Sequence, residues 1–172
     1  MLKPLNYFLD RWLLWALISS ILMLAIAHAF ETFGGYAPCT LCLKQREVYW
    51  VAGTVAMAGL IAGRLAFLPR LTRLFHALLT LIFTVGTVIA IYHAGAEWKF
   101  WPGPTTCAGT GALVSLDSLT AIANGTAKIK PPACDEAGWR FMGISMAGYN
   151  ALISLKLMAY SSLAACGFRF KS

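Results

Sequence analysis

The sequence has few charged residues: only 12% of its 172 residues are Asp, Glu, Lys or Arg, where an ordinary soluble domain has about 25%. This scarcity excludes a soluble enzyme of the usual kind, because too little charge is present to cover a surface in water. No period indicates an internal repeat, and no segment is of low complexity. What the sequence has in excess is apolar residues, at 59%. This composition predicts an integral membrane protein and excludes a disordered chain.

Four apolar stretches are long enough, or nearly so, to cross a bilayer as helices, which takes about 20 residues each. They cover residues 12–30, 39–63, 74–93 and 141–166. We therefore predict an all-α membrane protein, a four-helix transmembrane bundle that forms one domain over residues 1–172. The first stretch ends in Ala27-His28-Ala29, as a signal peptide can, but it is longer than a signal peptide's apolar run, so we expect it to be retained.

The basic residues are unevenly distributed, and they account for a net charge of +7. One side of the predicted bundle carries Lys3, Arg11, Arg64, Arg70, Arg73, Arg169 and Lys171 against a single acidic residue, Asp10. On the other side, acidic and basic residues balance. The positive-inside rule makes the basic side cytoplasmic, with both termini on it. A nucleic-acid partner is not expected, since no basic patch lies on a soluble face.

Two segments face the opposite compartment, residues 31–38 and 95–139. In the longer one, Leu113, Leu116, Leu119 and Ile122 recur every three residues with polar residues between them. This pattern predicts a short amphipathic helix that lies on the membrane surface.

Four of the five cysteines, Cys39, Cys42, Cys107 and Cys134, fall in or beside these exported segments, where disulfides persist. Four cysteines allow three connectivities, which the sequence leaves open. Cys39 and Cys42 are close enough in sequence to bridge locally. Bridges that only staple the loop are one alternative. A four-cysteine zinc site is another, but only one pair is closely spaced, so no metal is expected.

The Cys39-Thr-Leu-Cys42 pair stands directly before a predicted helix. A helix N-terminus favours a thiolate, and a C-x-x-C bridge exchanges readily. Arg46 lies one turn beyond Cys42 on the same helix face. Its permanent positive charge can stabilise a thiolate or an anionic acceptor. The pair is therefore a candidate redox site.

Three stretches together resemble the disulfide bond formation protein B (DsbB) family of bacterial inner-membrane thiol oxidases. They are Cys39-Thr-Leu-Cys42-Leu-Lys-Gln-Arg46, the segment from Tyr92-His93 to Trp101-Pro-Gly-Pro-Thr-Thr-Cys107, and Cys134-Asp-Glu followed by Trp139-Arg-Phe. The resemblance extends over nearly the whole chain. It implies a four-helix bundle with a periplasmic membrane-surface helix, and a protein dithiol:quinone oxidoreductase as the activity.

The resemblance also implies roles for single residues. Cys107 and Cys134 would form a loop disulfide that oxidises a periplasmic DsbA-like oxidase of the thioredoxin fold. Cys134 would pass its bond to Cys39, leaving the Cys42 thiolate beside a membrane quinone, either ubiquinone or menaquinone. Arg46 would bind that quinone. His93 would either exchange a proton there or only face water at the interface.

Two other functions fit part of the pattern. Vitamin K epoxide reductase-like enzymes also use four helices and a quinone, but their C-x-x-C lies on the last helix. A small transporter or scaffold with structural disulfides needs no Arg beside a C-x-x-C and should carry more polar groups in its spans. Among the remaining polar residues, we expect Glu97 to anchor the loop, Tyr49 to pack in the bundle and Asn150 to satisfy helix contacts.

Overall fold

The computed structural model describes residues 3–66, 69–104 and 134–167, and most of these are helical. The helices are α1 (Lys3–Asp10), α2 (Trp12–Thr32), α3 (Thr40–Ala66), α4 (Pro69–Glu97) and α6 (Met146–Ala165). A small antiparallel hairpin, β1 (Arg140–Phe141) and β2 (Ile144–Ser145), precedes α6. The predicted surface helix at residues 113–122, and Cys107, lie outside the described residues.

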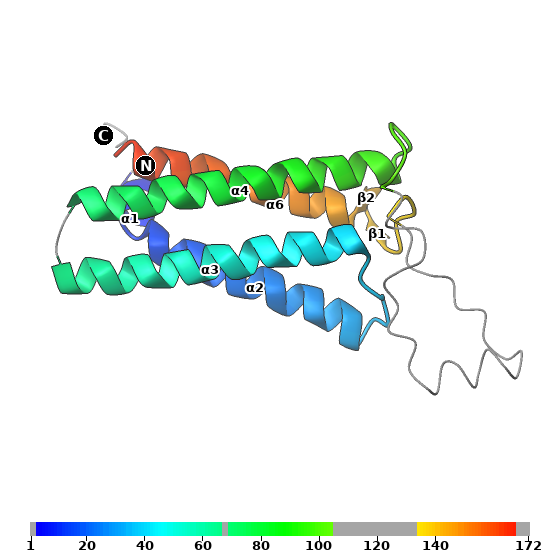
Figure 1. Ribbon diagram of the computed structural model, residues 1–172, viewed down its shortest axis with the longest axis horizontal. Coiled ribbons are helices and arrows are strands. Elements are labelled where there is room, and N and C mark those ends of the chain that lie inside the picture. Colours follow the sequence, from blue (N-terminus) through cyan, green and yellow to red (C-terminus); the bar gives the residue numbers. More distant parts are fainter. Residues whose placement is uncertain (1–2, 67–68, 105–133, 168–172) are drawn as a thin grey trace, which may run out of the picture.

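The long helices run side by side (Figure 1). Helix α2 packs against α3, α3 against α4, and α4 against α6, whereas α2 and α6 touch little. Helix α1, the end of α3 and the start of α4 lie at one end of the molecule (Figure 1). The hairpin and the start of α3 lie at the other end, so residues far apart in sequence meet there.

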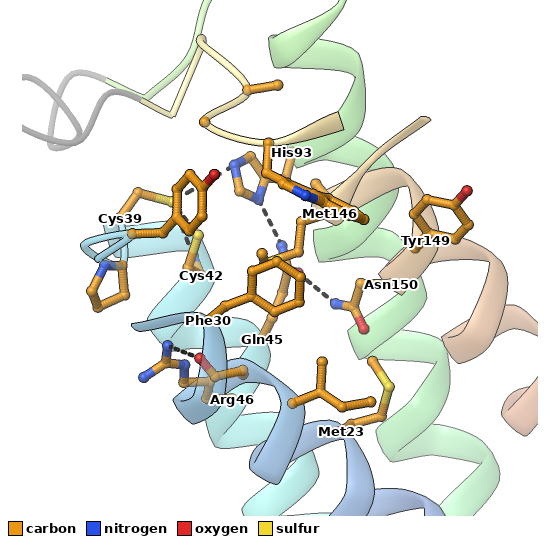
Figure 2. Close-up of a pocket in the computed structure, with 18 of the residues that line it drawn as sticks. Met23, Phe30, Cys39, Cys42, Gln45, Arg46, His93, Met146, Tyr149 and Asn150 are labelled. Carbon is orange, nitrogen blue, oxygen red and sulfur yellow. Dashed lines mark hydrogen bonds between the residues drawn. The ribbon is translucent and has the colours of Figure 1, made fainter. Parts of the chain in front are cut away.

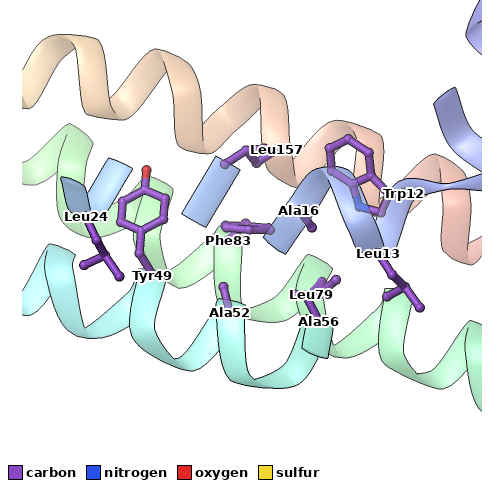
Figure 3. Close-up of a cluster of buried hydrophobic side chains, with 10 residues drawn as sticks. All are labelled: Trp12, Leu13, Ala16, Leu24, Tyr49, Ala52, Ala56, Leu79, Phe83 and Leu157. Carbon is purple, nitrogen blue, oxygen red and sulfur yellow. The ribbon is translucent and has the colours of Figure 1, made fainter. Parts of the chain in front are cut away.

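The interior combines small and large side chains. Ala16, Ala52 and Ala56 are completely buried and let the helices approach closely, while Leu79 and Phe83 fill the space between them (Figure 3). Small residues at helix contacts are typical of bundles in membranes. Buried polar side chains also link the helices: the Trp12 indole donates to the hydroxyl oxygen of Ser161 over 2.9 Å.

Two of the four predicted stretches form helices that are candidate membrane spans. Among the described residues, Trp12–Thr32 and Arg70–Glu97 are long and apolar enough to cross a bilayer. Helix α3 is less apolar because its second turn carries Lys44, Gln45, Arg46 and Glu47, and α6 carries Asn150 and Lys156. That α3 and α6 also span the membrane remains a prediction.

The prediction of an entirely α-helical protein was wrong in one place. Residues 140–145 form the β1–β2 hairpin rather than the first turn of the last helix. Its two-residue turn holds Met142 and Gly143 at φ values of 49° and 82°, as a type I′ hairpin turn requires. The Ser145 side chain then caps α6 by accepting the N–H of Gly148 over 3.1 Å. Apolar composition alone did not reveal this turn.

Candidate active site

A cavity of about 640 Å³ opens between α2 and α6 at the hairpin end of the molecule (Figure 2). Apolar side chains form most of its wall, among them Met23, Ala27, Phe30, Tyr36, Trp139, Met146 and Ile153. Its polar end is formed by Cys39, Cys42, Gln45, Arg46 and His93. Small-molecule sites commonly have this volume and this mixture of an apolar wall with a few polar groups.

The two cysteines of the C-x-x-C pair lie against this cavity. Cys39 precedes α3 directly and Cys42 lies in its first turn, with their Sγ atoms 2.7 Å apart. Both are free thiols, and this separation is within easy reach of a disulfide. The backbone N–H of Cys42 donates to the Cys39 sulfur over 3.2 Å. This hydrogen bond at the start of α3 stabilises negative charge on the Cys39 sulfur, whereas the contact with the Cys42 sulfur and burial raise the pKa of the Cys39 thiol.

Cys134 is packed against this pair. It is disulfide-bonded, only 1% exposed, and forms a buried cluster with Cys39, against which Leu41 and Cys42 also pack. Its disulfide partner is not among the other described cysteines, because Cys39, Cys42 and Cys166 are free. The pairing with Cys107 thus stays a prediction. One sulfur of a disulfide, that of Cys134, nevertheless lies beside the C-x-x-C pair.

The segment after α4 helps to hold Cys134 in place. This segment turns back, and the Trp101 indole stacks on Tyr92 and donates to its backbone oxygen over 2.9 Å. Gly95 makes room for the indole, because a Cβ there would lie 2.1 Å from Trp101. In the same segment, Lys99 forms an exposed ion pair of 2.8 Å with Asp135. The segment after α4 therefore contacts the residue next to Cys134.

His93 connects the cysteines to the rest of the bundle. It lies on α4, is 4% exposed, and its Nε2 atom is 3.6 Å from the Cys39 sulfur. The same Nε2 atom lies 3.7 Å from a carboxylate oxygen of Glu97. On the other side of the ring, the side-chain amide of Gln45 donates to Nδ1 over 2.9 Å. Both ring nitrogens therefore have buried partners, rather than the water contacts that an interfacial histidine would have.

A chain of polar side chains continues from His93 into the bundle (Figure 2). The Asn150 amide on α6 donates to the carbonyl oxygen of Gln45. The Tyr49 hydroxyl donates to the side-chain oxygen of Asn150 and also contacts the hydroxyl of Ser154 at 3.0 Å. All five of these side chains are buried. The chain joins α3, α4 and α6 around the end of the cavity.

Glu97 is a buried part of the site. It is the last residue of α4 and 8% exposed, and its second carboxylate oxygen accepts the hydroxyl of Ser145, the cap of α6. Sequence analysis had placed Glu97 in a loop, because the apolar stretch ends near His93. One helical turn separates Glu97 from His93, so the longer helix brings the two side chains together.

Arg46 lines the cavity but points toward α2. Its guanidinium forms an ion pair with Glu31 and donates to the backbone oxygen of Ala27 over 3.1 Å. Its side chain is 16% exposed, against 39% for Glu31. Arg46 is thus held in place at the cavity by the end of α2, and its charge lies near Cys42 through the shared helix rather than through a direct contact.

The structure gathers the described residues of the predicted site around one cavity: Cys39, Cys42, Arg46 and His93 line it, and Cys134 packs behind Cys39. Sequence analysis missed Gln45 and Glu97 and gave Asn150 only a structural role. Polarity within an apolar stretch was the available signal for Gln45 and Asn150, since such residues are costly in a membrane. Glu97 lies beyond the predicted stretch and carried no such signal. Cys39, Cys42 and His93 also place ligand atoms within 4.8 Å of one another, as a metal site would.

Comparison with known proteins identifies similar chains. The model of a family described as disulfide bond formation protein DsbB matches residues 10–164. A protein from Dechloromonas aromatica (strain RCB), named disulfide bond formation protein B, is 27% identical to this chain over 145 residues. The matched part is 82% of each chain. One from Methylococcus capsulatus (strain Bath) is 28% identical over 153 residues, 82% of this chain and 84% of the relative. Another from Marinobacter nauticus (strain VT8) is 28% identical over 137 residues, 76% of each chain.

Proposed function

The chain belongs to the disulfide bond formation protein B family, and on that premise we propose that it is a protein dithiol:quinone oxidoreductase. Its substrate would be the reduced form of a periplasmic, DsbA-like oxidase of the thioredoxin fold. Its electron acceptor would be a membrane quinone, ubiquinone or menaquinone. Family membership itself supports disulfide bond formation as the function, and the rest of the proposal depends on the site.

One observation carries the proposal: the disulfide-bonded Cys134 packs against the Cys39–Cys42 thiols at the polar end of an apolar cavity. Two sulfur pairs in contact can exchange disulfides, since exchange requires a thiolate within reach of a disulfide. A structural staple would have no need of a second, free pair beside it. The arrangement supports a route for electrons from an exported loop toward the cavity.

The proposed exchange conserves bonds and electrons. The partner's dithiol reduces the Cys107–Cys134 disulfide and becomes a disulfide itself. The Cys134 thiolate then attacks Cys39 of an oxidised Cys39–Cys42 pair, and Cys42 leaves as a thiolate. Attack of Cys107 on Cys134 breaks the Cys134–Cys39 bond, re-forms the loop disulfide and releases Cys39 as a thiolate. The C-x-x-C pair ends as a dithiol, the state in which the structure holds it.

The cavity fits a quinone chemically. Its wall of Met23, Phe30 and Ile153 suits an apolar ring and tail, while the polar end offers Cys42 and the donors of Arg46. A bound quinone would supply the acceptor for the two electrons and two protons of the reduced pair. Arg46 would orient the carbonyl oxygen and stabilise negative charge there, because its guanidinium is permanently charged and already held by Glu31.

We further propose that all four long helices span the bacterial inner membrane, with both termini in the cytoplasm. The support is an apolar outer surface: Leu22 on α2, Trp50 on α3, Val88 on α4 and Leu152 on α6 are each more than half exposed. Large apolar surfaces of this kind are rare on soluble monomers and suit lipid contact. The basic residues Arg11, Arg64, Arg70 and Arg73 come from the end of the bundle opposite the cysteines, as the positive-inside rule requires.

The experiment is to mix the purified protein with the reduced DsbA-like partner and a ubiquinone analogue. Loss of quinone absorbance should accompany oxidation of the partner. Cys42→Ser should abolish quinone reduction, while Cys166→Ser, which removes an exposed free thiol outside the site, should leave it unchanged. No quinone reduction by the wild-type protein, or equal rates for the wild type and Cys42→Ser, would refute the proposal.

A further inference from the structure

We propose that Gln45 and Asn150 are positioning residues that hold His93 as the neutral tautomer with its proton on Nε2. This N–H then donates a hydrogen bond to the Cys39 sulfur. The hydrogen-bond pattern rests on geometry alone, whereas its consequence for thiol exchange rests on the proposed function.

The Nδ1 atom of His93 must act as an acceptor. Its partner is the side-chain nitrogen of Gln45, 2.9 Å away, and an amide NH₂ group can only donate. A neutral imidazole that accepts at one nitrogen carries its proton on the other. The contact with Gln45 therefore selects the tautomer protonated on Nε2.

The orientation of the Gln45 amide is tied to that of the Asn150 amide. Its oxygen accepts the Asn150 NH₂ group, and the Asn150 oxygen in turn accepts the hydroxyl of Tyr49 over 2.5 Å. Ser154 approaches the same oxygen at 3.4 Å while it donates to the backbone oxygen of Asn150 over 2.7 Å. Turning over the Gln45 amide alone would set its NH₂ group against that of Asn150. Because these groups are buried, the lost hydrogen bonds would not be replaced by water.

The surroundings of Nε2 agree with this assignment. Both of its neighbours can accept a hydrogen bond, the Cys39 sulfur at 3.6 Å and the Glu97 carboxylate at 3.7 Å. The Ser145 hydroxyl donates to the other oxygen of Glu97, and the Ser145 oxygen accepts the N–H of Gly148 over 3.1 Å. Ser145 thus orients the carboxylate. A proton on Nε2 then faces two groups that can accept it in a hydrogen bond, the Cys39 sulfur and the Glu97 carboxylate.

The consequence concerns Cys39 as a leaving group. In the proposed exchange, Cys107 attacks Cys134, the Cys134–Cys39 bond breaks, and the electron pair stays on Cys39. The Nε2–H group of His93 points at the sulfur on which this charge develops. A donor placed there in advance stabilises the departing thiolate, because a leaving thiolate departs faster when its charge is stabilised.

The same geometry disfavours a metal ion at Cys39, Cys42 and His93, although their ligand atoms lie within 4.8 Å of one another. A metal would need the Nε2 lone pair, which moves the ring proton to Nδ1. That proton would then face the NH₂ group of Gln45, a contact between two donors. The Gln45→Glu variant removes this conflict, because a carboxylate can accept a hydrogen bond from the Nδ1–H group. Such a hydrogen bond supports a metal-bound histidine.

The test is ¹⁵N NMR of the reduced protein labelled at histidine, with His93 assigned by substitution of His28 and His76, the two other histidines. The wild-type protein should show an unprotonated Nδ1 and a protonated Nε2. Gln45→Glu should move the proton to Nδ1 or protonate both nitrogens. The matched control is Glu47→Gln, which alters an exposed neighbour paired with Lys44 and should leave the spectrum unchanged. A wild-type histidine protonated on Nδ1, or a Gln45→Glu spectrum identical to the wild type, would overturn the inference.

A Cd²⁺ titration of the same reduced samples, followed by thiolate-to-metal absorbance, gives a second readout. Gln45→Glu should bind Cd²⁺ roughly tenfold or more tightly than the wild type, the size of effect expected from a second-shell carboxylate. Equal affinities would count against the inference. Quinone reduction, measured in parallel, separates the two proposals: its absence with the expected tautomer would refute the proposed function alone, and its presence with the other tautomer would refute only this inference.

Discussion

Replacing Arg46 by alanine should impair the use of quinone far more than the stability of the protein. The ion pair with Glu31 lies partly in solvent, since the carboxylate side chain is 39% exposed. Exposed pairs contribute about 0–1 kcal/mol. Losing this pair and the hydrogen bond to Ala27 should therefore lower the free energy of unfolding by no more than about 1–2 kcal/mol.

The expected loss in quinone use is larger. A hydrogen bond from a charged donor is worth about 1.5–3 kcal/mol. If Arg46 makes one such bond to the quinone, its removal should raise the KM for a ubiquinone analogue roughly ten- to a hundredfold, since 1.4 kcal/mol corresponds to about a factor of ten. The KM of Arg46→Lys should fall between those of the wild type and Arg46→Ala. Lysine keeps the charge, but its ammonium group does not reproduce the planar fork with which the guanidinium bonds both Glu31 and Ala27.

The assay separates two steps. Steady-state quinone reduction gives the KM, and a single turnover without quinone gives the rate at which the reduced partner loses its thiols to the protein. Arg46→Ala should change the first and spare the second. Lys44→Ala is the matched control, because Lys44 is a neighbouring, exposed cation paired with Glu47 and should affect neither. Equal losses in both steps for Arg46→Ala would refute the role assigned to Arg46.

Three further substitutions test the structure around the site. Gly95→Ala should displace the Trp101 indole, since the new Cβ would lie 2.1 Å from it, and destabilise the protein by about 1–3 kcal/mol; an unchanged Tm would contradict this packing. Asn150→Leu should cost about 1–3 kcal/mol by leaving the buried Gln45 oxygen without its donor, measurable by chemical denaturation, whereas equal stability would mean that the amide is not needed. Gly143→Ala should cost about 1–2 kcal/mol because its φ is 82°, and no loss would show that the hairpin tolerates another turn.

The sequence predicts those features of the structure that depend on residues close together in the chain. Hydropathy located α2 and α4 because it averages many neighbouring residues, and it erred at the helix ends, where α4 continues to Glu97. The pairing of Cys42 with Arg46 on one helix face follows from local spacing alone. The hairpin turn at Met142 and Gly143 carries a weaker local signal, and the apolar residues around it obscured that signal.

The polar chain at the site could not be predicted in the same way. Gln45 and His93 are separated by 48 residues, and Gln45 and Asn150 by 105. Each of them, taken alone in the sequence, is a polar residue in an apolar stretch with no indication of its partner. Only the packing of α3 against α4, and of α4 against α6, brings them together. The sequence shows only that these residues are polar within apolar stretches, whereas the structure shows which residues they contact.

Helix packing alone does not account for this chain. Apolar side chains of similar shape in place of Gln45 and Asn150 could pack these helices with little loss, and could even stabilise them, because a buried hydrogen-bonded pair gains little over an apolar one. The polar pair has one effect that an apolar pair lacks: it fixes where His93 carries its proton. Since His93 lies 3.6 Å from the Cys39 sulfur, the chain ends on a reactive atom. Control of that sulfur, rather than added stability, is therefore what the polar chain contributes under the proposed function.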